Sequence, residues 1–123
     1  MENTYDDYCK IFVSSQTTST VVELLEEATG GTFERKTANL STLTMDVLQN
    51  PDRKLESGDF VTWPVLIELE KETQATWEDY VAKISEILTY LWEHRTPAVA
   101  SCDFEALLPW NGGIEKWPAE NRF

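Results

Sequence analysis

The side chains of this sequence that could carry out acid–base or metal chemistry are few and scattered. His94 is the only histidine, and it stands beside Arg95 at the predicted end of a helix, where its expected role is to bind the last carbonyl groups. Cys9 and Cys102 are too few and too widely spaced for a zinc site or a disulfide framework. We therefore expect no metal site, and we interpret both thiols as small core residues.

One pair of carboxylates could support hydrolysis. Asp103 and Glu105 would point to the same side of the chain if the strand before them continues, and two carboxylates can act as general acid and base. However, the chain has 22 acidic residues, so pairs at this spacing arise by chance. It contains no phosphate-binding loop, dinucleotide-binding fingerprint or nucleophilic serine motif. The sequence therefore predicts a protein that is not an enzyme and that needs no cofactor.

Acidic and aromatic residues together favour a different role, contact with a basic protein. Tryptophan supplies buried area at an interface, and carboxylates pair with Arg or Lys of the partner. The stretch Thr96 to Trp110 changes at Asp103 from apolar to acidic and aromatic. The predicted partner-binding residues are Asp59, Trp63, Asp103, Phe104, Glu105, Trp110, Glu115 and Trp117.

The sequence leaves other interpretations of these residues open. Trp63 and Phe104 could belong to the core, where large apolar side chains are commonly found. Trp110 and Trp117 could instead clamp the C-terminal tail onto the sheet. The acidic residues could simply be solvated. The cluster is better supported than any single residue within it.

Hydrophobic periodicity predicts the elements that position these residues. It predicts strands at Cys9 to Ser14, Thr32 to Ala38, Leu43 to Val47, Phe60 to Glu70 and Ala98 to Cys102. Pro64 indicates an edge position or a bulge in the fourth strand, because proline cannot donate to the ladder. Helical spacing predicts a short helix that begins at Thr20-x-x-Glu23 and ends at Gly30-Gly31, and a long helix from Thr76 to His94.

This order of elements predicts an α+β fold. Two β-α-β halves favour a ferredoxin-like antiparallel sheet of four to five strands with two helices on one face. In that arrangement the first and last strands lie side by side in the middle of the sheet, so Cys9 and Cys102 are expected to be neighbours. The length of the chain suits one domain, and residues 1–123 are predicted to form it.

The charge of the chain restricts its partners. Twenty-two acidic and ten basic residues give a net charge of −12. Such a field repels nucleic acids and anionic membranes and attracts a basic protein, although it could also serve only to keep the chain in solution. The polar, acidic start and the absence of a long apolar run predict neither a signal peptide nor a membrane span, so we expect a cytoplasmic protein.

The second half of the chain resembles bacterial immunity proteins in its layout. The run DFVTWPVLIELE, a long amphipathic helix and then VASCDFEALLPWNGG carry this resemblance. It is similar to proteins that neutralise the toxins of contact-dependent inhibition and other polymorphic toxin systems. The resemblance implies tight one-to-one binding to a cognate toxin domain, often a nuclease with a basic cleft. The alternative from another class is a ferredoxin-like regulatory or oligomerising module that binds a small ligand or itself.

Overall fold

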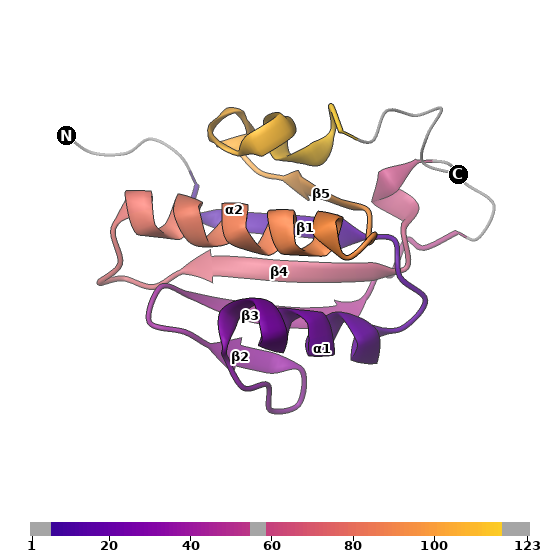
Figure 1. Cartoon of the computed structure of the whole chain (residues 1–123), viewed down its shortest axis with the longest axis horizontal. Helices are drawn as coiled ribbons and strands as arrows, with labels where there is room; N and C mark the ends of the chain where they lie inside the picture. Colours follow the sequence, from indigo (N-terminus) through magenta and orange to yellow (C-terminus); the bar gives the residue numbers. More distant parts are fainter. Residues whose placement is uncertain (1–5, 55–58, 117–123) are drawn as a thin grey trace.

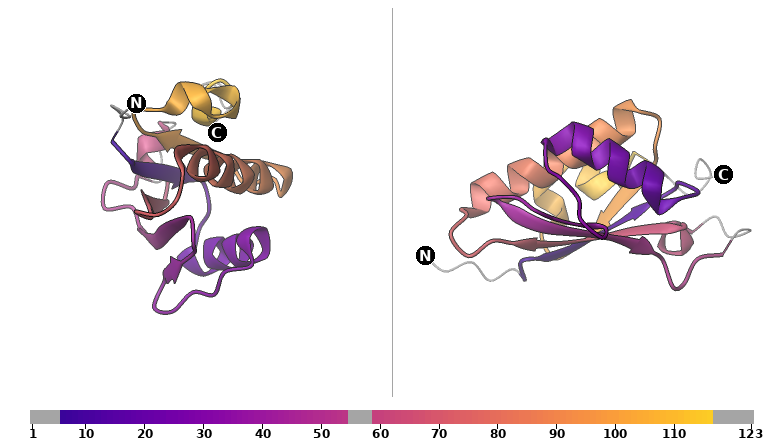
Figure 2. Two further views of the ribbon diagram at one scale, coloured as in Figure 1. Left: turned by 90° about the vertical axis from the view of Figure 1, so that its left-hand side faces the viewer. Right: turned by 90° about the horizontal axis from the view of Figure 1, so that it is seen from below.

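The chain folds into one antiparallel sheet with both helices on the same face (Figures 1 and 2). The computed structural model describes residues 6–54 and 59–116. The regular elements are β1 (Tyr8–Val13), α1 (Thr18–Thr29), β2 (Thr37–Asn39), β3 (Leu43–Gln49), β4 (Val65–Lys71), α2 (Trp77–Glu93) and β5 (Ala98–Ser101). Three short 3₁₀ turns are η1 (Phe60–Thr62), η2 (Glu105–Leu107) and η3 (Pro109–Gly113).

The strand order confirms the predicted ferredoxin-like arrangement. The sheet runs β2-β3-β4-β1-β5, and every neighbouring pair is antiparallel. The chain passes from β1 through α1 to the β2–β3 hairpin, and from β4 through α2 to β5. Each helix therefore crosses over one intervening strand, which is the split β-α-β pattern. β2 is an additional edge strand beyond the four strands of that pattern.

The main core lies between the sheet and the two helices. Alternate residues of the strands point to the helices, as the period-two patterns predicted, and include Ile11, Val47, Ile67 and Leu69. The helices contribute one apolar face each, and these side chains are fully buried. They are Val21 and Leu25 of α1 and Tyr80, Ile84, Ile87, Leu88 and Leu91 of α2.

A smaller apolar cluster covers one end of the opposite face of the sheet. It contains Phe12, Trp63, Leu66 and Val99, with Phe60 and Ile114 packed against it. The predicted strand Phe60 to Glu70 is wrong in its first part, because η1 occupies residues 60–62 and the strand begins only after Pro64. Trp63 therefore lies on the face opposite to Val65, and Pro64 precedes a central strand without interrupting it.

The helix ends follow from local hydrogen bonding. Thr76 caps α2 as expected, because its side chain accepts the N–H of Asp79 at 3.1 Å. The cap of α1 is Thr17, whose Oγ1 accepts the N–H of Thr20 at 3.2 Å, so the predicted capping box at Thr20 is wrong. Gly30 ends α1 in the left-handed conformation.

β5 is an edge strand, which corrects the prediction that it lies in the middle of the sheet. It pairs with β1 on one side only. The segment from η2 to η3 lies along its outer side (Figure 1), and a Cβ atom on Gly113 would sit 2.5 Å from the carbonyl oxygen of Ala98. The small residues of β5 are thus explained by close contact with a glycine-containing cover, which also shields the free edge.

The expected proximity of the two cysteines is confirmed. The β1–β5 register pairs Lys10 with Ser101, so its continuation places Cys9 opposite Cys102. Cys9 is buried, and its Sγ donates to the carbonyl oxygen of Lys10 at 3.8 Å. The neighbouring thiol of Cys102 and burial together raise the pKa of Cys9.

The predicted strand Thr32 to Ala38 is largely wrong. Only Thr37–Asn39 pairs regularly with β3. Arg35 and Lys36 have positive φ angles, so the chain turns at these residues and cannot extend the strand. Within the described ranges, no helix is long and apolar enough to cross a membrane.

Candidate recognition surface

The segment after β5 places several of the predicted contact residues at the surface. Asp103 is exposed, and its Oδ2 accepts the backbone N–H of Asp6 at 3.1 Å. Glu105 is half-buried, because its Oε2 accepts the N–H of Cys102 at 3.0 Å and fixes the turn into η2. Glu115 is exposed beyond η3. These acids therefore lie outside the core, and Glu105 also has a structural role.

Two predicted contact residues are core residues instead. Phe104 is 0% exposed and packs edge-on against Trp77, with 5.2 Å between the ring centroids. Trp63 is 1% exposed and belongs to the small cluster on the far side of the sheet. Asp59 is exposed and caps η1. Trp117 lies outside the described residues.

Trp110 is the most exposed large apolar side chain among the described residues, at 56%. Its φ angle of 55° places it in the left-handed region, which is uncommon for a bulky residue. Lys116 lies over the rings of both Trp110 and Trp92, at 5.4 and 5.6 Å from their centroids. A hollow of about 320 Å³ separates Trp110 from the end of α2, with Glu93 at its rim. Trp110 is therefore held in place yet open to a partner.

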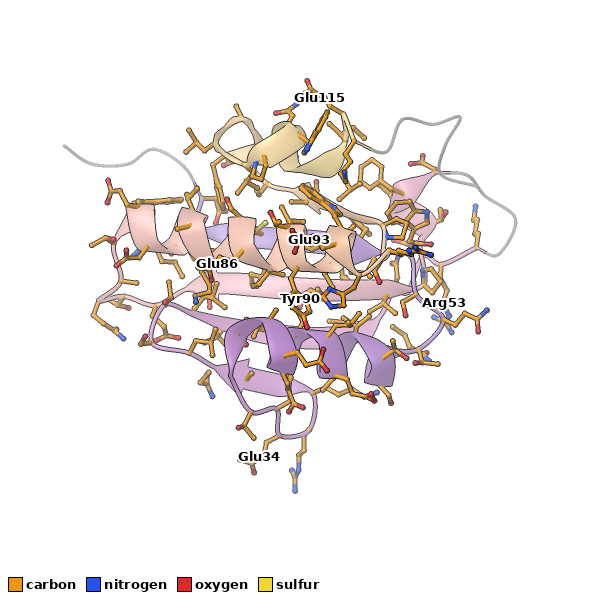
Figure 3. All side chains as sticks on the ribbon, viewed as in Figure 1. Glu34, Arg53, Glu86, Tyr90, Glu93 and Glu115 are labelled. Carbon is orange, nitrogen blue, oxygen red and sulfur yellow. The ribbon has the colours of Figure 1, made fainter. Side chains whose placement is uncertain are left out.

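A second hollow continues this surface between α1 and α2. It has a volume of about 560 Å³ and shares Thr89 and Glu93 with the hollow beside Trp110. Its lining includes the small residues Ala28, Ala82 and Ser85, which leave room between the helices. Glu86, Tyr90 and Glu93 stand along the outer side of α2 (Figure 3). We call this region, from the α1–α2 hollow to Trp110, the acidic helix face.

Acidic residues far outnumber basic residues on the two helices. α1 contains three acidic residues and no basic residue, and α2 contains four acidic residues and one basic residue. The one base, Lys83, is paired with Glu86 at 3.0 Å. The two helices together carry a net charge of −6, half of the chain's −12, and this surface suits a positively charged partner.

Tyr90 is fixed at the centre of the acidic helix face. Its hydroxyl donates a hydrogen bond of 2.7 Å to Glu27 of α1, and this bond raises the pKa of Tyr90. The ring stacks on His94 with 4.0 Å between centroids. Nδ1 of His94 lies 2.8 Å from the carbonyl oxygen of Tyr90, in agreement with the capping role predicted for this histidine. An aromatic ring held in this way can be buried by a partner at low entropic cost.

The comparisons with known proteins leave the surface to be judged on its chemistry. No protein family, curated protein or solved structure matches this chain. Across residues 6–54 and 59–116, no three His, Cys, Asp or Glu side chains gather in a way that could hold a metal ion.

Sequence reasoning missed Glu86, Tyr90 and Glu93. The available signal was the composition of the two helices, which hold almost no basic residues, and the exposed positions can be read from the helical period.

Proposed function

We propose that this protein is an immunity protein that binds a basic cognate toxin domain and neutralises it through the acidic helix face. The observation that carries the proposal is the combination of seven acidic residues against one basic residue on α1 and α2 with the exposed Trp110 beside them. The resemblance of the second half of the chain to immunity proteins supports the same role. In that role the protein would act in the cytoplasm, where its cysteines stay reduced.

Each part of this surface has a physical task in such a complex. Carboxylates attract the basic groove that a nuclease presents to phosphates, and can raise the association rate to about 10⁸ M⁻¹s⁻¹ or more at low salt. Trp110 and Tyr90 then supply apolar area that is desolvated on contact, as aromatic residues do at interface hot spots. The hollow between α1 and α2 offers space for a side chain or helix of the toxin.

Co-expression with candidate toxin domains, chosen from genes that neighbour the gene of this protein, tests the proposal directly. Cells that produce both proteins should grow, and the two chains should elute as one complex from a sizing column at micromolar concentration. If the toxin still kills and no complex forms, the immunity function is refuted. Elution of the protein alone as a stable oligomer would favour the oligomerising module instead.

A charge-reversal pair tests which face binds. Glu86→Lys with Glu93→Lys should slow association with the toxin by about tenfold at low salt, because it removes part of the attracting field. Glu34→Lys with Glu70→Lys is the matched control, since both residues are exposed and the net charge changes equally. Glu34 lies away from the acidic helix face (Figure 3), and Glu70 follows the core residue Leu69 in β4 and so lies on the opposite face of the sheet. Equal slowing by both pairs would show that only the net charge matters, and would contradict the assignment of the face.

A further inference from the structure

A separate hollow lies on the face of the sheet away from the helices, where β3 leads into β4. Its volume is about 470 Å³. Phe12 and Leu66, which belong to the small apolar cluster, line it together with Val61, which is 40% exposed. This hollow therefore offers apolar contact area at the surface.

Basic residues gather around this hollow although the chain is strongly acidic. Lys10, Arg53 and Lys54, three of the ten bases of the chain, line it, and Asp52 is the one acidic residue in its lining among the described residues. None of the three forms an ion pair with a carboxylate in the described part of the chain. Glu68 stands opposite Lys10 in the β1–β4 register, but its Oε2 accepts the hydroxyl of Tyr8 at 2.7 Å.

The wall that carries Arg53 and Lys54 is held by a buried side chain. Asn50 is 2% exposed, and its Nδ2 donates to the carbonyl oxygens of Val61 and Trp63, both at 2.8 Å. Its Oδ1 accepts the N–H of Asp52 at 3.0 Å. The N–H of Lys54 donates to the carbonyl oxygen of Thr62 at 3.0 Å. Residues 50–54 are thereby fastened to the residues around η1, so the hollow exists before any ligand arrives.

We propose that this hollow binds a small amphipathic anion, a carboxylate or phosphate group attached to an apolar, preferably aromatic, body. A concave apolar lining with a few converging polar groups is the usual form of a small-molecule site. Nη1 of Arg53 donates to the carbonyl oxygen of Asn50 at 3.0 Å, so Nη2 and Nε remain to hold two oxygens of such a head group. Lys10 and Lys54 add positive charge. Phe12, Val61 and Leu66 take the apolar body. This site lies on the other face from the acidic helix face, so the inference does not depend on the proposed function.

Fluorescence titration with anilinonaphthalene sulfonate, an aromatic anion whose emission rises in apolar surroundings, tests this site in the folded protein. We expect saturable binding that Lys54→Glu weakens by at least about fivefold, because the charge beside the head group is reversed. Lys10→Glu should act in the same direction. Phenylnaphthylamine, a neutral relative of the probe, should bind the wild type and Lys54→Glu equally within about twofold, since it lacks the charged group.

Lys36→Glu is the matched control, because Lys36 is also exposed and the change in net charge is the same, while the residue lies in the turn before β2. It should leave the affinity for the anionic probe unchanged. Equal weakening by Lys36→Glu would mean that the probe senses only the total charge, and would overturn the proposal. Absence of saturable binding, or amide shift changes that map to the α1–α2 hollow when the probe is followed by NMR, would also overturn it.

Competition identifies the head group and the need for an apolar body. Phenyl phosphate or benzoate should displace the probe, and the stronger of the two defines the preferred anion. Inorganic phosphate should displace it much less at the same concentration. Equal displacement by inorganic phosphate would contradict the role of Phe12, Val61 and Leu66.

Discussion

Two aromatic residues six positions apart, Phe104 and Trp110, differ in exposure: one belongs to the core and the other to the surface. Phe104 is fully buried against Trp77 and Tyr80 and holds the C-terminal segment to α2. Trp110 is more than half exposed and adopts a left-handed backbone conformation. An exposed bulky residue with such a backbone has no evident benefit for folding, which favours a role in binding.

Trp110→Ala should therefore weaken binding to the toxin domain by about tenfold or more, because an aromatic anchor is removed from the proposed interface. The midpoint of thermal unfolding should move by no more than about 2 °C, as expected for an exposed residue. Surface plasmon resonance and a thermal scan give the two values.

Phe104→Ala is the control for this prediction. It should lower the free energy of unfolding by about 3–5 kcal/mol, because a large buried ring leaves a cavity. Trp110→Ala could instead destabilise the chain while the folded variant, at low temperature, binds the toxin domain with unchanged affinity. This result would show that Trp110 only clamps the tail.

At the scale of elements, the cover over β5 depends on close backbone approach. Gly113 has a φ of 105°, and a Cβ there would also lie 3.0 Å from the ring of Trp92. The indole N–H of Trp92 donates to the carbonyl oxygen of Ala98 at 2.9 Å, so the same strand is held from the end of α2.

Gly113→Ala should lower the free energy of unfolding by roughly 2–4 kcal/mol, because the methyl group meets the carbonyl of Ala98 and the φ angle becomes strained. Urea denaturation measures this loss. Gly30→Ala is the matched control, since Gly30 also has a positive φ but nothing within 4 Å of the new Cβ, and it should cost only about 1 kcal/mol. If the two substitutions cost the same, the cover does not pack on β5.

The elements also show what the sequence could predict and what it could not. Apolar residues at alternate positions predicted both strands, Met45 and Val47 in β3 and Ile67 and Leu69 in β4. The pattern was informative because the inner face of each strand packs against a continuous core. The local pattern could not tell whether β5 lies in the middle or at the edge of the sheet. A run of small apolar residues fits a strand with a second neighbouring strand and equally fits an edge strand covered by a glycine-containing segment. A strand that began at Phe60 would place Trp63 and Val65 on the same face, but η1 precedes Pro64 and Trp63 lies on the other face.

The candidate surface was predictable only in part, for a related reason. Trp110 and Glu115 follow the last strand and were identified from residue type, whereas Phe104 in the same run is buried by long-range contacts with Tyr80. Glu93 belongs to α2, and its approach to Trp110 depends on the path of the chain after β5. Contacts between residues far apart in sequence decide which acids share a surface.

At the scale of the whole molecule, the two sites proposed above lie on opposite faces and differ in the charges that line them. The helices present carboxylates, while the hollow on the sheet gathers Lys10, Arg53 and Lys54. A basic protein and a small anion could therefore be bound at the same time without competing for one site.

The stability of the folded chain should decline at alkaline pH. Burial raises the pKa values of Tyr80 and Tyr8 above that of an ordinary tyrosine, and the hydrogen bond to Glu68 adds to the shift of Tyr8. A raised pKa in the folded state gives stability that is complete below the unfolded pKa, about 10, and is lost as the pH rises through the folded pKa. The free energy of unfolding should thus fall from about pH 9.5 upward, by up to about 1.4 kcal/mol per pH unit for Tyr80.

Urea denaturation at a series of pH values measures this slope. Tyr80→Phe should make it shallower, whereas Tyr90→Phe, which removes a hydroxyl from the helix surface, should change it less. A slope that is the same in Tyr80→Phe and in the wild type would show that the buried tyrosine does not control alkaline unfolding.

The position of β1 has a consequence for how the chain emerges during synthesis. Val13 pairs with Val65 on one side and with Ala98 on the other, so both partners of β1 lie in the second half of the sequence. A nascent chain on the ribosome therefore carries an unpaired apolar strand until β4 appears, and an uncovered β5 until η3 follows. Interrupted synthesis would leave an aggregation-prone fragment with an unpaired apolar strand. We therefore expect rapid synthesis of this protein to benefit from a chaperone that shields its N-terminal half.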